Sequence, residues 1–136
     1  MKLLMIFCNK FSFEPGIKTL DQFETVKSGK SYNNILAGFI QAEKEDEADP
    51  AGVEKKLIKN LKWAAKKNET KTILLHSFAH LSNSKAEPEF TKSLFDQSQQ
   101  RLENADYKCY QTPFGYFLHL NLDAPGNSHA RIFKSF

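Results

Sequence analysis

Short apolar runs in the first third of the chain predict β-strands. Residues 2–8 are almost continuously apolar, which is typical of a strand buried on both faces. Phe11–Glu14 alternates apolar and polar side chains and stops at a Pro-Gly pair, so we expect a second, hairpin-related strand there. A further strand is expected over residues 35–43, with Gly38 inside it, whereas residues 17–33 are polar and predict no clear element.

Two longer stretches have the spacing of amphipathic helices. Asp49-Pro50 is a typical helix start, because aspartate caps free N–H groups and proline fits the first turn. We expect this helix to continue to Lys67, with its lysines on the side opposite the core. Four apolar residues mark its core-facing stripe: Val53, Leu57, Leu61 and Ala64. A second helix is expected over Pro88–Asn104.

The remaining apolar segments predict strands that alternate with these helices. We expect strands at residues 72–76 and 107–112, the latter joined by a tight turn to an antiparallel partner at 116–123. A short element is expected at 131–136. This order of elements predicts one α/β domain over residues 1–136. It would have two layers, with a twisted sheet covered on one face by the two helices.

Composition narrows the class of protein without identifying it. The chain has 136 residues, a net charge of +3 and a pI of about 8.8, which is compatible with RNA binding but too weak to indicate it. Cys8 and Cys109 have no CxxC spacing, so we expect reduced thiols and a cytoplasmic protein. Without a zinc-type ligand set, a nucleotide-binding motif or an apolar run near ~18 residues, we expect no metal, no cofactor and no membrane span.

Two short segments carry the residues best placed for chemistry. Phe78-Ala79-His80-Leu81-Ser82 follows a predicted strand and puts a histidine near its carboxyl end, where α/β folds often bind ligands. Pro113-Phe114-Gly115-Tyr116 occupies the predicted turn. Together the two segments resemble the N-terminal editing domain of archaeal threonyl-tRNA synthetases, a domain with the fold of D-aminoacyl-tRNA deacylases. The resemblance extends from Met1 to about Asp123.

The resemblance implies roles for individual residues. Ala79 and His80 would line the pocket for the aminoacyl-adenosine end of tRNA, where a neutral imidazole could orient the substrate or a water. Gly115 and Tyr116 would contact the same substrate. Phe117 falls at a position where the family carries an aromatic residue.

A third matching segment, residues 37–44, implies further pocket residues. Gly38 and Ala42 are small enough to leave room for an adenine or an amino-acid side chain, and Glu43 follows them. Close packing beneath the first helix explains the same small residues equally well.

Two positions depart from the family. Leu118 stands where the family has a lysine, and Arg131 stands where it has a glutamate. His119 cannot take the place of the lysine, because alternation along a strand puts it on the opposite face. In this family hydrolysis is thought to use the 2′-hydroxyl of the terminal ribose and a positioned water, so pocket shape and backbone donors could still support activity.

The resemblance therefore implies an enzyme that hydrolyses mischarged aminoacyl-tRNA, with seryl-tRNA for threonine as the leading substrate. Two alternatives stay open: removal of D-amino acids from tRNA, and a non-catalytic module that binds tRNA or dimerises. The expected partners are the 3′ end of tRNA, a threonyl-tRNA synthetase core served in cis or in trans, and a second copy of the chain in a homodimer.

Overall fold

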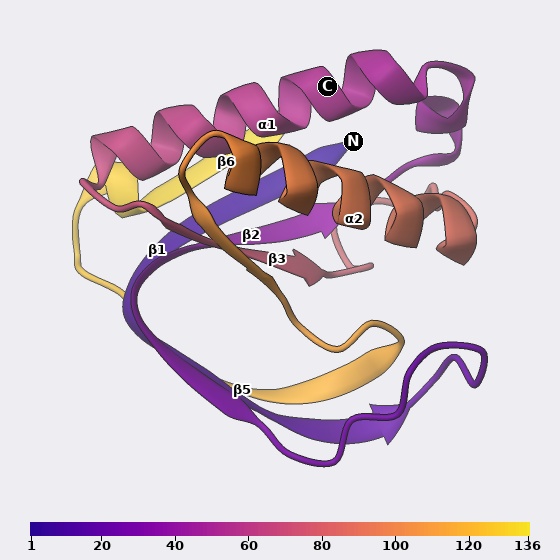
Figure 1. Ribbon diagram of the computed structural model, residues 1–136, viewed down its shortest axis with the longest axis horizontal. Coiled ribbons are helices and arrows are strands. Elements are labelled where there is room, and N and C mark those ends of the chain that lie inside the picture. Colours follow the sequence, from indigo (N-terminus) through magenta and orange to yellow (C-terminus); the bar gives the residue numbers. More distant parts are fainter.

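The computed structural model describes residues 1–136 and combines one mixed sheet with two α-helices (Figure 1). Its elements in chain order are β1 (Lys2–Lys18), β2 (Lys30–Gln41), the 3-10 helix η1 (Lys44–Ala48), α1 (Pro50–Lys67), β3 (Thr72–Ser77), α2 (Pro88–Asn104), β4 (Lys108–Gln111), β5 (Tyr116–Asp123), the 3-10 helix η2 (Ser128–Ala130) and β6 (Arg131–Ser135).

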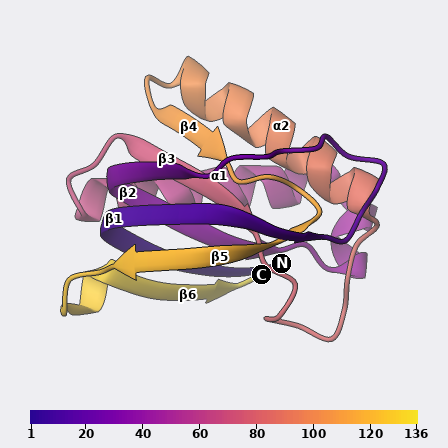
Figure 2. The same cartoon turned by 90° about the horizontal axis from the view of Figure 1, so that it is seen from below.

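Strand β1 organises the sheet because it pairs with three other strands. The strand order is β4-β3-β2-β1-β5, and β6 also pairs with β1. Strand β2 runs antiparallel along most of β1, β6 pairs with its first half and β5 with its second half. Strands β2, β3 and β4 are parallel to one another. The sheet curls strongly. In Figure 1, β5 therefore lies below the first half of β1. In both views β5 lies beside the second half of β1 (Figure 2).

Both α-helices cover the outer face of the curled sheet (Figure 1). The Asp49 carboxylate accepts a hydrogen bond from the Gly52 amide at the start of α1, which confirms the predicted cap. All four residues of the predicted stripe of α1 are buried. They belong to a cluster of 18 buried residues that joins the sheet to both helices and includes Leu3, Leu36 and Phe95. The predicted α/β class, with two helices on one face, is therefore confirmed.

The inner face of the sheet carries a second, smaller cluster. Its seven buried residues are Cys8, Phe11, Phe13, Ile35, Ala37, Phe39 and Leu74. Neighbouring residues of β1 and β2 alternate between this cluster and the helix-covered one, as the pleat of a strand requires. Both cysteines are free and buried. Burial raises the pKa of the Cys8 thiol to about 11 and that of Cys109 to about 12, so both thiols stay protonated at neutral pH.

Two predicted strand arrangements are wrong. Residues 2–8 and Phe11–Glu14 form one 17-residue strand, because Asn9 and Lys10 continue the extended backbone between two sets of partners. The strand at 116–123 does not pair with the one at 107–112, since β4 pairs with β3 and β5 pairs with β1. Gly115, with a φ of 80°, redirects the chain across the molecule instead of closing a hairpin.

No helix of the chain combines the length and the apolar character that crossing a bilayer requires.

Candidate functional site

A cavity of about 410 Å³ opens where the carboxyl end of β3, the segment that follows it and the start of β5 meet. Its volume lies in the range of small-ligand pockets. Seven of the residues expected at the site line it: Ala42, Ala79, His80, Gly115, Tyr116, Phe117 and Leu118. The structure therefore brings together the segments 78–82 and 113–116, which are about 35 residues apart in the chain.

Three expected site residues lie elsewhere. A Cβ on Gly38 would stand 3.1 Å from Leu61 of α1, so this glycine serves close packing under the helix. Arg131 is exposed at the start of β6, where its guanidinium donates to the carbonyl oxygen of Pro125. Glu43 also lies outside the cavity lining. It is linked to the segment after β3 by a hydrogen bond from Ser82.

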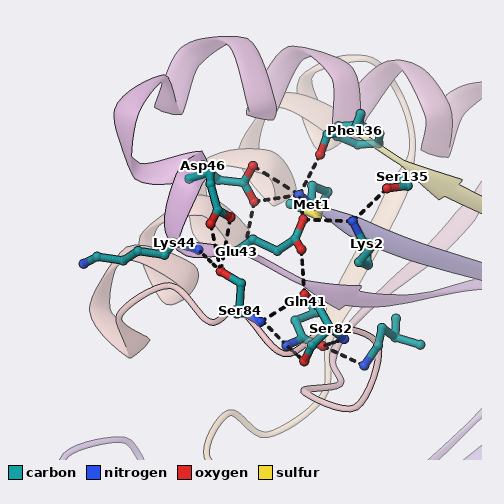
Figure 3. Close-up of polar contacts among 12 residues, drawn as sticks. Met1, Lys2, Gln41, Glu43, Lys44, Asp46, Ser82, Ser84, Ser135 and Phe136 are labelled. Atoms are coloured by element: carbon teal, nitrogen blue, oxygen red, sulfur yellow. Dashed lines mark hydrogen bonds and ion pairs between the residues drawn. The ribbon is translucent and has the colours of Figure 1, made fainter.

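The segment after β3 is held by the buried side chain of Gln41, at the end of β2. Its amide oxygen accepts hydrogen bonds from the amides of Leu81 (2.6 Å) and Ser82 (2.8 Å). Its amide nitrogen donates to the carbonyl oxygens of Ser82 (2.9 Å) and Ser84 (3.0 Å). Figure 3 labels Gln41, Ser82 and Ser84, which make three of these four contacts. One glutamine thus satisfies four backbone groups of a segment that has no regular structure of its own.

Glu43 supports the same segment through Ser82. The Ser82 hydroxyl donates to Glu43 at 2.6 Å, and the Lys2 ammonium and the N-terminal ammonium of Met1 donate to the other carboxylate oxygen (Figure 3). Burial alone would raise the pKa of Glu43, but these three donors outweigh it and lower the pKa to about 2. Glu43 is therefore an ionised anchor behind the cavity wall.

An aromatic row forms one wall of the cavity. The rings of Phe78 and His80 meet edge to face with centroids 4.9 Å apart, and His80 stacks on Phe117 of β5 at 6.2 Å. His80 and Phe117 are both exposed at the rim, and Phe117 retains 56% of its surface. The row bridges the two segments that carry the candidate chemistry.

A second histidine, His76, lines the interior of the cavity. It is buried among Phe11, Phe39 and Phe78, and its Nδ1 shares a hydrogen bond with the Thr112 hydroxyl at 2.8 Å. Burial lowers its pKa to about 4, so its imidazole is neutral at pH 7. The sequence analysis missed His76, because a histidine inside an apolar strand gives no signal that separates a cavity wall from a core position.

The turn before β5 closes the other side. A Cβ on Gly115 would stand 2.8 Å from the Leu20 Cβ, and its carbonyl oxygen accepts from the Thr19 amide at 2.7 Å. The Tyr116 hydroxyl accepts a hydrogen bond from the Val26 amide at 3.0 Å. These contacts tie the turn to residues 19–26, which follow the end of β1.

The charged side chains that line the cavity are few and carry only positive charge. No aspartate or glutamate lines the cavity, whereas Lys85 does, and its ammonium has no ion-pair partner. The backbone around Lys85 is fixed, since the Ala86 amide donates to the carbonyl oxygen of Ala42 at 3.0 Å. The amides of Ala79 and His80 donate to no protein acceptor. No group of three or more metal-ligating side chains is present.

Known proteins are similar to this chain over its whole length. A family model described as the archaea-specific editing domain of threonyl-tRNA synthetase matches residues 1–136. Similar curated proteins include the threonine–tRNA ligases of Thermococcus kodakarensis (28% identical over 139 residues, 99% of this chain) and Methanococcus maripaludis strain C5 (28% over 127 residues, 93% of this chain). The chain spans 22% and 20% of the length of these two relatives.

Among solved structures, the c-Myc DNA unwinding element binding protein aligns over 100% of this chain and 99% of its own, with a TM-score of 0.67 and 12% identity. At that identity the likeness concerns the fold alone.

Proposed function

The chain belongs to the archaea-specific editing domains of threonyl-tRNA synthetase, and from this premise we propose that it hydrolyses the ester of mischarged aminoacyl-tRNA, with seryl-tRNA for threonine as its substrate. The observation that carries the proposal is the cavity that gathers Ala79, His80 and Phe117 from two distant segments. Its size suits an adenosine with a small amino acid attached.

The need for such a hydrolase follows from the chemistry of the two amino acids. Serine lacks only one methyl group of threonine, and a methyl is worth only about 1–3 kcal/mol of discrimination in a binding pocket. A synthetase therefore makes seryl-tRNA at a low rate, and a second site that hydrolyses the smaller ester removes it.

The cavity supports a mechanism without a protein general base. It contains no carboxylate, and His76 is a weak base because its pKa is about 4. The ribose 2′-hydroxyl of the terminal adenosine would then orient the attacking water, and the free amides of Ala79 and His80 would stabilise the oxyanion that develops on the ester carbonyl. The role of His80 is to position substrate or water from the rim.

Leu118 and Lys85 set the polarity of this cavity. Leu118 packs with Leu120 against the inner-face cluster. The position at which the family carries a lysine therefore contributes an apolar wall here. Lys85 supplies a cation from a different segment, and it is suited to bind a phosphate of the acceptor end or the amino acid's hydroxyl.

The proposal includes the partners implied by the family. A threonyl-tRNA synthetase core would supply the substrate, in the same chain or in trans, and a second copy would complete a homodimer. The exposed side chains of Leu122 and Phe133 are apolar surface that such a dimer could cover. Light scattering at tens of micromolar tests the dimer, and a monomer mass contradicts it.

Ester loss from three substrates tests the proposal: Ser-tRNA for threonine, Thr-tRNA for threonine and a D-aminoacyl-tRNA. The expected result is faster loss from Ser-tRNA than from Thr-tRNA, by a modest factor, and slower loss from the D-aminoacyl-tRNA. Preferential loss from the D-aminoacyl-tRNA would replace our proposal with a D-aminoacyl-tRNA deacylase. Binding of tRNA without loss from any substrate would indicate a non-catalytic module.

A further inference from the structure

A second cleft, of about 550 Å³, lies next to the cavity described above. Pro113 and Phe114 line both spaces and form the partition between them. Thr112 lines the second cleft and also hydrogen-bonds His76, which lines the first. The two spaces therefore lie on either side of a single turn.

Tyrosines make the floor of this second cleft. The rings of Tyr32, from β2, and Tyr110, from β4, lie with their centroids 5.0 Å apart and their planes tilted by 38°. Tyr110 keeps 39% of its surface exposed, so one side of the pair is open to a ligand. Burial and the neighbouring Tyr110 raise the pKa of Tyr32, which keeps its phenol neutral. An exposed aromatic face is the usual platform on which a protein stacks an unpaired base.

The second cleft is also lined by a fixed set of polar groups from α2 and β4. The Gln111 side chain donates to Asp96 (2.9 Å) and to Gln99 (2.7 Å), and the Lys92 ammonium donates to Asp96 (2.8 Å) and to Gln111 (3.0 Å). Burial raises the pKa of Asp96, but the hydrogen bonds from Lys92 and Gln111 outweigh it and lower the pKa, so its carboxylate is ionised. An ionised carboxylate accepts a hydrogen bond from an exocyclic amino group, such as that of cytosine.

The second cleft also contains a lysine that could bind a phosphate. Lys30 lines the second cleft and has no ion-pair partner, so it is free to contact a phosphate. Aromatic stacking, a carboxylate acceptor and an unpaired cation together match a single-stranded nucleotide whose base carries an amino group.

We propose that the second cleft is a nucleotide subsite, which binds the cytidines that precede the terminal adenosine of the tRNA acceptor end. The proposal rests on the proposed function, because that function places the terminal adenosine in the first cavity. The subsite would hold the acceptor strand on both sides of the Pro113-Phe114 partition and set the depth to which the ester enters.

Equilibrium binding of two unreactive probes tests this: the ribotrinucleotide CCA and adenosine. We expect CCA to bind at least about 10-fold more tightly than adenosine, since stacking of each base adds affinity. Tyr110→Ala should weaken CCA binding by about 10-fold and leave adenosine binding unchanged, whereas Tyr110→Phe should retain both. The ribotrinucleotide UUA should bind more weakly than CCA, because uracil offers no amino group to Asp96.

Trp63→Ala is the matched control, because Trp63 is an exposed aromatic residue outside both spaces, and it should change neither affinity. CCA binding no tighter than adenosine binding would overturn the subsite. So would equal weakening of both probes by Tyr110→Ala, which would indicate a structural role. Loss of hydrolysis in all the ester assays, with CCA binding and its Tyr110 dependence intact, would overturn the proposed reaction and leave the subsite standing.

Discussion

Leu118 is the residue whose chemistry matters most for substrate selection. It lines the cavity from β5 and contributes no polar group. A polar contact to a substrate hydroxyl or amine gives large discrimination, whereas an apolar wall gives little. We therefore expect weak selectivity for serine over threonine in the native chain, and about a 10-fold gain in Leu118→Lys.

The measurement is the ratio of kcat/KM for Ser-tRNA and Thr-tRNA. Because Leu118 also packs against the inner-face cluster, the thermal midpoint of the variant is measured alongside. An unchanged ratio in a folded variant would mean that Leu118 serves packing alone.

The role of His80 in hydrolysis can also be tested by substitution, with His119 as the control. His80→Ala should lower kcat by about 10- to 100-fold, because the side chain that positions the substrate or water is lost. It should change tRNA affinity little. Phosphate contacts elsewhere carry most of that affinity. His119→Ala should change neither quantity, since His119 is exposed and does not line the cavity. Equal effects of the two substitutions would remove His80 from the site.

At the scale of elements, the segment after β3 depends on Gln41. Its four hydrogen bonds to Leu81, Ser82 and Ser84 are the main restraint on a segment that lacks regular structure. Gln41→Ala should therefore lower the free energy of unfolding by about 1–3 kcal/mol, because buried backbone groups lose their partners. The same variant should speed hydrogen exchange of the Leu81 and Ser82 amides.

Urea unfolding and exchange followed by NMR measure the two effects. Asn60→Ala is the control, since its side chain hydrogen-bonds only within the exposed side of α1, and it should change the free energy of unfolding by less than about 0.5 kcal/mol. Unchanged exchange at Leu81 in Gln41→Ala would show that the segment is held by other contacts.

The helices could be predicted from sequence because their signals are local. Asp49-Pro50 and the apolar stripe of α1 depend only on residues within the helix, and Pro88 begins α2 where it was expected. Strand pairing could not be predicted, because partners are chosen by the whole sheet. Nothing near Gly115 says that Tyr116 will pair with Lys18 rather than with the strand just before the turn.

The site was predictable to the extent that it follows short motifs. Ala79, His80 and Phe117 could be expected at one site because their segments match a known pattern, and all three line the cavity. Lys85 and His76 carry no such pattern, and only the folded chain places them at the cavity wall. Gly38 shows the converse, since a small residue at a plausible spacing proved to face α1.

At the scale of the whole molecule, two groups with shifted pKa values predict how stability depends on pH. His76 has a folded-state pKa of about 4, below its ordinary 6.5, so between these values the unfolded chain binds a proton that the folded chain excludes. Stability should therefore fall by about 3 kcal/mol as the pH drops from 6.5 to 4. Glu43, with a pKa of about 2 against 4.5, contributes stability above pH 4.5 that is lost as the pH falls towards 2.

Urea unfolding at a series of pH values measures both effects. His76→Gln should flatten the dependence between pH 6.5 and 4 and leave the loss below pH 4.5. A wild-type free energy of unfolding that stays constant from pH 6.5 to 4 would contradict the burial of a neutral imidazole at this position.

The central strand β1 also has a consequence for the order of folding during synthesis. Within this domain β1 leaves the ribosome before the other strands, whereas β5 and β6, which pair with most of one edge of it, leave after them. Until residues 116–135 emerge, that edge stays unpaired, and an unpaired edge invites association with other chains. Native pairing therefore depends on contacts of long sequence separation, which predicts slow folding for a domain of this size and a nascent chain that needs protection from aggregation.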